Sequence, residues 1–289
     1  MAKRKSMGQR RGRKRKHCDS DKENVPVKIR IDRTTVQLDQ KQWMPAEAVQ
    51  FFSRHKNIDE KLNRIESSVE LVGPFRVLRG ELQAEGVDLI MLDRDKLDLP
   101  EAQVFMTCTA GRYAFWRDTP YEDPKAVVFI DRRTIPDPTV IGSTVAHALL
   151  HFVDLYSNFK DVKVSRSVFR RVLGFTDHEM SELSRGRATD VNTQLCSGDY
   201  GGEILRLGNL MGFEQQSDVV NLLSPFYEKV DECNRQKEYE KGLRLGHLLF
   251  LANRSWYQQK STELLTFAYE HLGRRDFTEI LKLTLELRD

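Results

Sequence analysis

The order of apolar patterns along the chain constrains its fold more than any other feature. Between residues 75 and 130, short apolar runs are separated by Gly, Pro and Asp, which is typical of strands joined by turns. From residue 138 onward, apolar residues recur at steps of three and four, the spacing of helices that bury one face. Strands followed by helices predict an α+β fold with a small N-terminal sheet and a helical C-terminal region. The expected strands are residues 75–78, 87–92, 104–107, 112–116 and 126–130, after an alternating segment at 27–31.

Helices are also expected at residues 45–72 and over most of the last third of the chain. Four amphipathic stretches follow residue 203, and Pro225 is expected to kink or split the first of them. Such stripes usually form a core packed on the rest of the domain. Alternatively they form a surface for a partner, which exposure of Trp256, Tyr257 or Phe267 would favour. The four stretches are residues 219–230, 239–253, 261–272 and 277–287.

The charge of the chain is unevenly distributed. The 289 residues carry a formal net charge of +3, yet nine Lys and Arg and no acidic residue lie between residues 3 and 16. Removing those nine charges leaves the rest at 3 − 9 = −6. Residues 1–26 are too polar to fold alone. We therefore predict a disordered tail at 1–26, an α+β domain at 27–205 and a helical region at 206–289 packed on it.

The basic tail carries two short signals. One cluster predicts nuclear import or contact with DNA phosphates, since both need exposed cations, although a merely solvated tail has the same composition. This cluster is Arg10, Arg11, Arg13, Lys14, Arg15 and Lys16. Just beyond it, Lys22, Glu23 and Asn24 precede a proline and resemble the KEN degron read by the anaphase-promoting complex.

Neither a membrane span nor a secretory signal is expected, because no apolar run is long enough. The four cysteines are widely separated and give no disulfide or zinc pattern. A reducing compartment, the nucleus or the cytosol, is the simplest interpretation.

One helix carries two histidines that could share a metal ion. His147 and His151 are four residues apart, so they point the same way and could ligate one zinc. Asp154 lies on the same face and could orient a ligating histidine. Ala148 stands where a zinc peptidase needs its general base, and an alanine cannot carry a proton. The competing interpretation is a core helix, since the neighbouring residues are apolar.

This neighbourhood resembles the metallopeptidase family that processes an ATP synthase subunit in mitochondria, whose animal members are also described as Ku-binding proteins. The family has His-Glu-x-x-His-x-x-Asp after an apolar strand, and residues 147–154 follow that frame except at Ala148. Residues 189–193 and 197–200 match its second motif in register. The resemblance implies a zincin-like fold, with zinc held by His147 and His151. It also implies that Asp190 is a third ligand or a partner of one.

These features together predict a nuclear adaptor built on an inactive metallopeptidase. Its body would bind protein partners in chromosome maintenance or the cell cycle, and its tail would provide import or DNA contact. Whether the chain is an enzyme stays open, with the missing base favouring no activity. One alternative is a mitochondrial zinc peptidase or ATP synthase assembly factor, and another is a nucleic-acid-binding protein.

Overall fold

The computed structural model describes most of the two regions in which structure was expected. It covers residues 43–160 with gaps at 56, 64–65, 85–86, 121 and 134–137, then residues 174–176 and 216–288. These residues belong to one compact unit, Leu38–Asp289. The basic tail and the KEN-like residues fall outside the described ranges.

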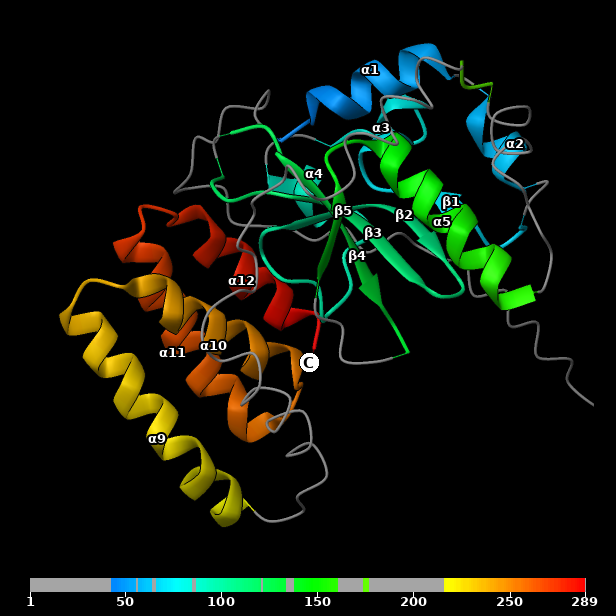
Figure 1. Cartoon of the computed structure of the whole chain (residues 1–289). Coiled ribbons are helices and arrows are strands. Elements are labelled where there is room, and N and C mark those ends of the chain that lie inside the picture. Colours follow the sequence, from blue (N-terminus) through cyan, green and yellow to red (C-terminus); the bar gives the residue numbers. More distant parts are fainter. Residues whose placement is uncertain are drawn as a thin grey trace, which may run out of the picture. The chain divides into compact units, whose positions relative to one another are not determined.

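The centre of this unit is a five-stranded antiparallel meander in the order β1-β2-β3-β4-β5 (Figure 1). The strands predicted at 104–107, 112–116 and 126–130 are confirmed and form its middle. A turn at residues 109–110 joins β2 to β3 and a loop at residues 117–125 joins β3 to β4, and each strand pairs with its neighbour in sequence. The strands are β1 (Glu70–Leu71), β2 (Ala102–Cys108), β3 (Gly111–Trp116), β4 (Ala126–Asp131) and β5 (Thr139–Gly142).

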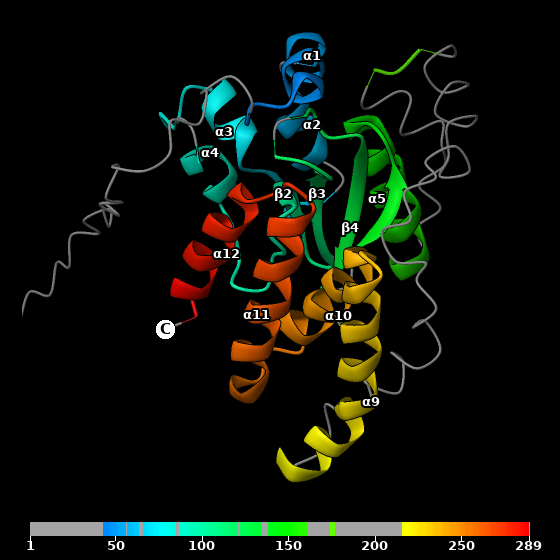
Figure 2. The same ribbon diagram turned by 90° about the vertical axis from the view of Figure 1, so that its left-hand side faces the viewer.

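Both faces of the sheet are buried, which explains why its strands read as nearly continuous apolar runs. Alternate side chains point to opposite faces: Tyr113 and Phe115 enter one core, whereas Ala114 and Trp116 enter the other. Helices near the N-terminus and α5 (Val145–Lys160) cover the first face. The C-terminal helices cover the second face (Figure 2).

Four short helices precede the central strands. Two of them occupy residues predicted as strands, 75–78 and 87–92, so those two predictions are wrong. A short apolar run has the same appearance in a buried helix as in a strand, and Pro74 at the first helical position favours the helix. The predicted helix at 45–72 is interrupted and ends in β1. The helices are α1 (Ala46–Arg54), α2 (Ile58–Asn63), α3 (Pro74–Leu78) and α4 (Val87–Met91).

The C-terminal region contains four longer helices that correspond to the four predicted stretches. Pro225 lies inside the first of them without ending it. The second and third pack closely because Gly246 faces Leu265, whose side chain a Cβ at residue 246 would approach to 2.8 Å. The helices are α9 (Gln216–Arg235), α10 (Tyr239–Leu251), α11 (Ser255–His271) and α12 (Asp276–Glu286).

The arrangement confirms the α+β class. Residues 139–142 form strand β5 although they were predicted to be helical, because Val140 pairs with Val128 of β4. Among the helices that can be described, none combines the length and the hydrophobicity of a membrane-spanning segment.

Candidate functional site

The two histidines of the predicted metal pair lie on α5, in packed surroundings. The His147 ring is buried, and its Nδ1 lies 2.8 Å from Thr144 Oγ1. Gly142 leaves room for this ring, since a Cβ at residue 142 would come within 2.4 Å of it. His151 Nδ1 is 3.0 Å from the Tyr113 hydroxyl, and its ring packs 4.9 Å from that of Phe129.

The described residues around the two histidines include no complete metal site. In the described ranges, no group of three His, Cys, Asp or Glu side chains could hold a metal ion. Asp154 is half-buried on α5, and Asp190 lies outside the described residues. Ala148 is fully buried in the core, so a glutamate there would be buried as well. Zinc at His147, His151 and Asp190 stays a prediction, which metal analysis of the purified protein would decide.

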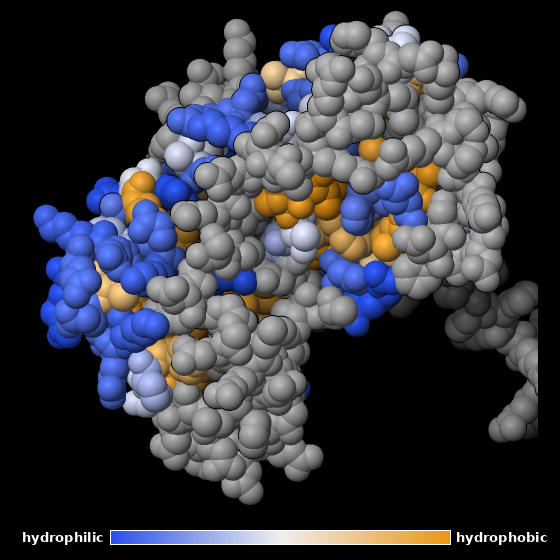
Figure 3. All heavy atoms as spheres, in the orientation of Figure 1, coloured by the Kyte–Doolittle hydropathy of each residue, from blue (hydrophilic) through white to orange (hydrophobic). Residues whose placement is uncertain are grey.

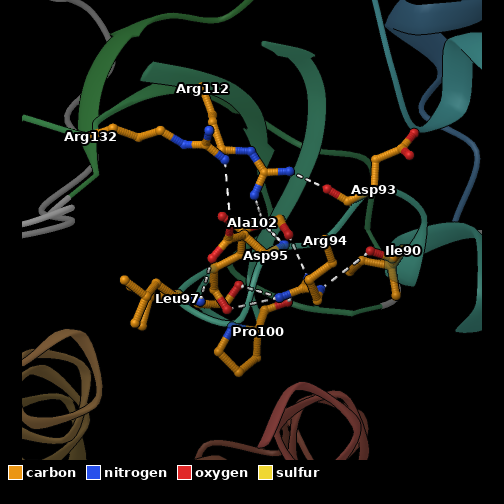
Figure 4. A network of polar contacts seen from close by, with 11 residues as sticks. Ile90, Asp93, Arg94, Asp95, Leu97, Pro100, Ala102, Arg112 and Arg132 are labelled. Carbon is orange, nitrogen blue, oxygen red and sulfur yellow. Dashed lines mark hydrogen bonds and ion pairs between the residues drawn. The ribbon is translucent and has the colours of Figure 1, made fainter. Parts of the chain in front are cut away.

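A buried arginine organises the loop that leads into β2. Arg94 is 9% exposed and donates hydrogen bonds to five backbone carbonyls, at distances from 2.6 to 3.4 Å (Figure 4). Burial lowers the pKa of Arg94 to about 10, so it remains charged at neutral pH. We call these contacts the Arg94 network. The accepting carbonyls are those of Ile90, Asp98, Leu99, Pro100 and Ala102.

A second arginine joins this loop to the sheet. Arg112 of β3 forms a buried ion pair with Asp98 and donates to the Asp93 carbonyl. Burial raises the pKa of Asp98, while the charges of Arg112 and Arg94 act in the opposite direction. The loop is therefore held to the sheet by one buried ion pair and by a hydrogen bond to a backbone carbonyl.

A buried carboxylate then connects the sheet region to the C-terminal helices. Glu101, just before β2, is 1% exposed, and its Oε1 lies 2.9 Å from His247 Nε2 of α10. The Tyr269 hydroxyl of α11 donates to the same oxygen at 2.8 Å. Burial by itself raises the pKa of Glu101, but the charge and hydrogen bond of His247 and the hydrogen bond of Tyr269 outweigh it and lower the pKa. We call these three residues the Glu101 cluster.

The end of the chain is fixed to the same body. Arg288 donates to the carbonyls of Lys96 at 2.9 Å and Phe250 at 3.1 Å, and its guanidinium lies 3.8 Å from the centre of the Phe250 ring. Burial lowers the pKa of Arg288 to about 10. Helices α10 to α12 thus form an extension of the sheet region, held to it by these contacts and by a shared core.

On this extension, the turn from α9 to α10 presents exposed carboxylates. The turn is tight: the Glu238 amide donates to the Cys233 carbonyl at 2.8 Å, and Lys237 has a left-handed φ of 63°. Arg235 Nε donates to Glu232 Oε2 at 3.0 Å, and Gln236 Nε2 donates to Oε1 at 2.8 Å. We call its exposed acidic residues the carboxylate corner: Asp231, Glu232, Glu238 and Glu240.

An aromatic group lies beside this corner. The Tyr239 ring is 6.0 Å from that of Phe267 and 4.6 Å from that of His271, and the last two rings are 4.1 Å apart. Phe267 is 39% exposed, whereas Tyr257 is buried. The third aromatic residue whose exposure was expected to favour a partner surface is Trp256, and its side chain is not among those that the structure describes. Figure 3 shows the helical region as mostly hydrophilic with isolated hydrophobic spots.

Sequence reasoning found only part of this surface. It named Phe267 as a side chain whose exposure would indicate a partner surface, but not the carboxylates of the neighbouring turn. The available signal was that residues 231, 232, 238 and 240 are acidic on either side of a helix end. No sequence signal indicated the role of Glu101, because nothing in its local sequence shows that His247 lies against it.

Comparison with known families decides between the interpretations of this molecule. A family model described as histone PARylation factor 1 matches residues 26–191 and 203–288. The chain belongs to the histone PARylation factor 1 family. The match covers the sheet and the C-terminal helices, and a search of curated proteins finds no match.

This membership corrects the expectations drawn from the histidine helix. The resemblance to the ATP synthase-processing metallopeptidases is wrong, and so is the inactive-metallopeptidase adaptor inferred from it. The zincin-like fold is not confirmed, and the mitochondrial alternative has no support. The short motifs were not specific, because two histidines four residues apart also occur in helices that pack into a core. Helix α5 is such a helix. Protein partners, by contrast, agree with a family named for the modification of histones.

Proposed function

We propose that this protein is an accessory factor that directs poly(ADP-ribosyl)ation onto histones. The supporting observation is the match of the family model to both the sheet region and the helical region. Such a factor works with a transferase that takes ADP-ribose from NAD⁺ and with the histone that accepts it. Its function therefore requires protein-binding surfaces held in defined positions. The Arg94 network and the Glu101 cluster support this, because they connect the loop before β2 and the C-terminal helices to the sheet region.

Within this function, the carboxylate corner is the candidate surface for the histone. Histone tails are rich in Lys and Arg, and carboxylates form charge-assisted hydrogen bonds with both. Glu232 is the best oriented of the four, because Arg235 and Gln236 hold its two oxygens. The hydrogen bond from Arg235 lowers the pKa of Glu232, so the group is ionised at neutral pH.

Neutralising Glu232 is expected to reduce histone modification. We predict that Glu232→Gln lowers the initial rate of histone ADP-ribosylation roughly tenfold or more, the effect of losing one charge-assisted contact. The measurement combines full-length factor, a poly(ADP-ribose) polymerase, histone octamers and labelled NAD⁺, and it follows label on histones and polymerase separately.

Glu279→Gln is the matched control. Glu279 on α12 is paired with Lys282 at 2.8 Å, and its side chain is 49% exposed compared with 51% for Glu232. This variant is expected to behave like the unchanged protein. Equal losses in both variants, or none at Glu232→Gln, would remove Glu232 from the proposed surface. If the unchanged protein has no effect on histone labelling, the proposed function itself is wrong.

The basic tail supports a nuclear location, which agrees with a histone-directed role. We expect that removing residues 1–18 shifts a tagged protein from the nucleus towards the cytosol, because the six-residue basic cluster is lost. Quantitative imaging would measure the nuclear fraction, with Lys22→Ala as a control outside the cluster. An unchanged nuclear fraction would contradict the import prediction. DNA contact by the tail and a degron at residues 22–24 also stay predictions.

A further inference from the structure

The aromatic side chains beside the carboxylate corner have an arrangement that simple packing does not require. The three rings of Tyr239, Phe267 and His271 contact one another, yet Phe267 and His271 are exposed. Phe267 is one of three large hydrophobic side chains in the described ranges whose exposed fraction is 39% or more, and the other two are aliphatic. We call Tyr239, Phe267 and His271 the aromatic platform.

The platform is fixed in position rather than free to collapse. His271 Nδ1 lies 2.9 Å from the Phe267 carbonyl, one turn back on α11, which fixes the imidazole relative to that helix. The adjacent residues Ala268 and Tyr269 are buried in the core shared with the sheet. Because α11 buries Ala268 and Tyr269, its orientation is fixed, and the Phe267 and His271 rings stay at the surface.

Two residues of the platform have an acidic neighbour in the sequence. Glu240 follows Tyr239, Glu270 precedes His271, and both are exposed and form no ion pair with any residue that the structure describes. Two basic residues of the same turn are paired with carboxylates, Arg235 with Glu232 and Lys241 with Glu238 at 2.6 Å, whereas Lys237 is exposed. Aromatic faces attract cations, and carboxylates beside them strengthen that preference.

We propose that the aromatic platform receives a lysine or arginine side chain of a histone tail. This inference rests on the proposed function and adds a recognition element to it. The cation lies over the Phe267 and Tyr239 rings, and Glu240 and Glu270 provide the complementary charge. The platform selects a basic segment, while the carboxylate corner next to it contacts the neighbouring cations of the same segment.

Peptide binding to the full-length protein tests the platform directly. The probe is a fluorescein-labelled histone-tail peptide, compared with a peptide in which acetyl-lysine replaces Lys and citrulline replaces Arg. Anisotropy titrations use the unchanged protein and the double variant Tyr239→Leu/Phe267→Leu, which keeps apolar bulk but removes two ring faces. We expect the double variant to bind the basic peptide at least fivefold more weakly, and the neutral peptide to bind poorly to both.

Two further variants show whether a loss is specific. Phe267→Tyr keeps an aromatic face and is expected to retain binding. Leu287→Ala changes another exposed hydrophobic residue, 42% exposed at the end of α12, and is expected to have no effect. Circular dichroism and the melting temperature confirm that each variant folds, and Phe267→Leu alone replaces the double variant if that one does not.

The platform is overturned if the leucine variants bind the basic peptide as the unchanged protein does, or if the unchanged protein does not prefer the basic peptide. The labelling assay with the unchanged protein then separates the two proposals. Histone ADP-ribosylation that still depends on this factor leaves the proposed function standing without the platform. No dependence on the factor removes the function whatever the peptide result.

Discussion

Replacing Glu101 by leucine is expected to lower the free energy of unfolding by about 3–5 kcal/mol, the usual cost of removing one partner from a buried charged contact. The change leaves His247 Nε2 and the Tyr269 hydroxyl without the oxygen that both now contact at 2.9 and 2.8 Å. Glu101→Gln keeps the shape and one acceptor oxygen, so a smaller loss of roughly 1–2 kcal/mol is expected. Urea denaturation followed by circular dichroism measures both.

The same contact predicts how stability depends on pH. The pKa of Glu101 is lowered in the folded state, so its contribution is complete above the ordinary glutamate pKa of 4.5. That contribution is lost as the pH falls below 4.5 and through the lowered pKa of the folded state. Glu101→Gln should remove this part of the acid sensitivity. A variant with the same pH profile as the unchanged protein would contradict the role assigned to the carboxylate.

Replacing Arg94 by methionine is the second substitution with a large expected effect. Methionine fills much of the space but donates no hydrogen bond, so the five carbonyls of the Arg94 network lose their common donor. Each buried carbonyl left unpaired costs about 1–3 kcal/mol, and partial relaxation of the loop reduces the sum. We expect a total loss of roughly 3–5 kcal/mol in the free energy of unfolding.

Arg132→Met provides the control for this experiment. The Arg132 side chain is 52% exposed, and its one polar contact with a described residue is 3.4 Å to Asp95, so its replacement should cost less than about 0.5 kcal/mol. Thermal and urea unfolding of both variants would be compared under identical conditions. A loss at Arg94→Met no greater than at Arg132→Met would show that the network does not stabilise the loop. Arg94→Lys is expected to lie between the two, because an ammonium has fewer donors.

The strands and helices that could be predicted share a simple property: their apolar pattern decides the element locally. Strands β3 and β4 are apolar runs between turns in the sequence. In helices α9 to α12, apolar residues recur at helical spacing. Helices α3 and α4 could not be distinguished from strands, because five residues are too few to show a period. Strand β5 depends on pairing with Val128, which no local pattern reveals.

For the candidate site too, local features could be predicted and tertiary contacts could not. The spacing of His147 and His151 placed them correctly on one helix, but what the rings contact depends on Tyr113 of β3 and on Gly142 at the end of β5. Of the aromatic side chains whose exposure was expected to favour a partner surface, Phe267 is exposed and Tyr257 is buried. The acidic residues of the α9–α10 turn could not be linked to Phe267 from the sequence. The structure links them, because Tyr239 of this turn contacts Phe267 of α11.

Local patterns in the sequence predicted the α+β class, the middle strands, the four C-terminal helices and the separation of a basic tail from an acidic body. Each of these follows from periodicity or charge within a short window. The packing of the folded chain was needed to show that both faces of the sheet are covered, that His147 and His151 lie in packed polar contacts, and that Glu101 contacts His247 and Tyr269. Those contacts join residues as many as 168 positions apart, and their free energy arises only when folding removes water from both partners.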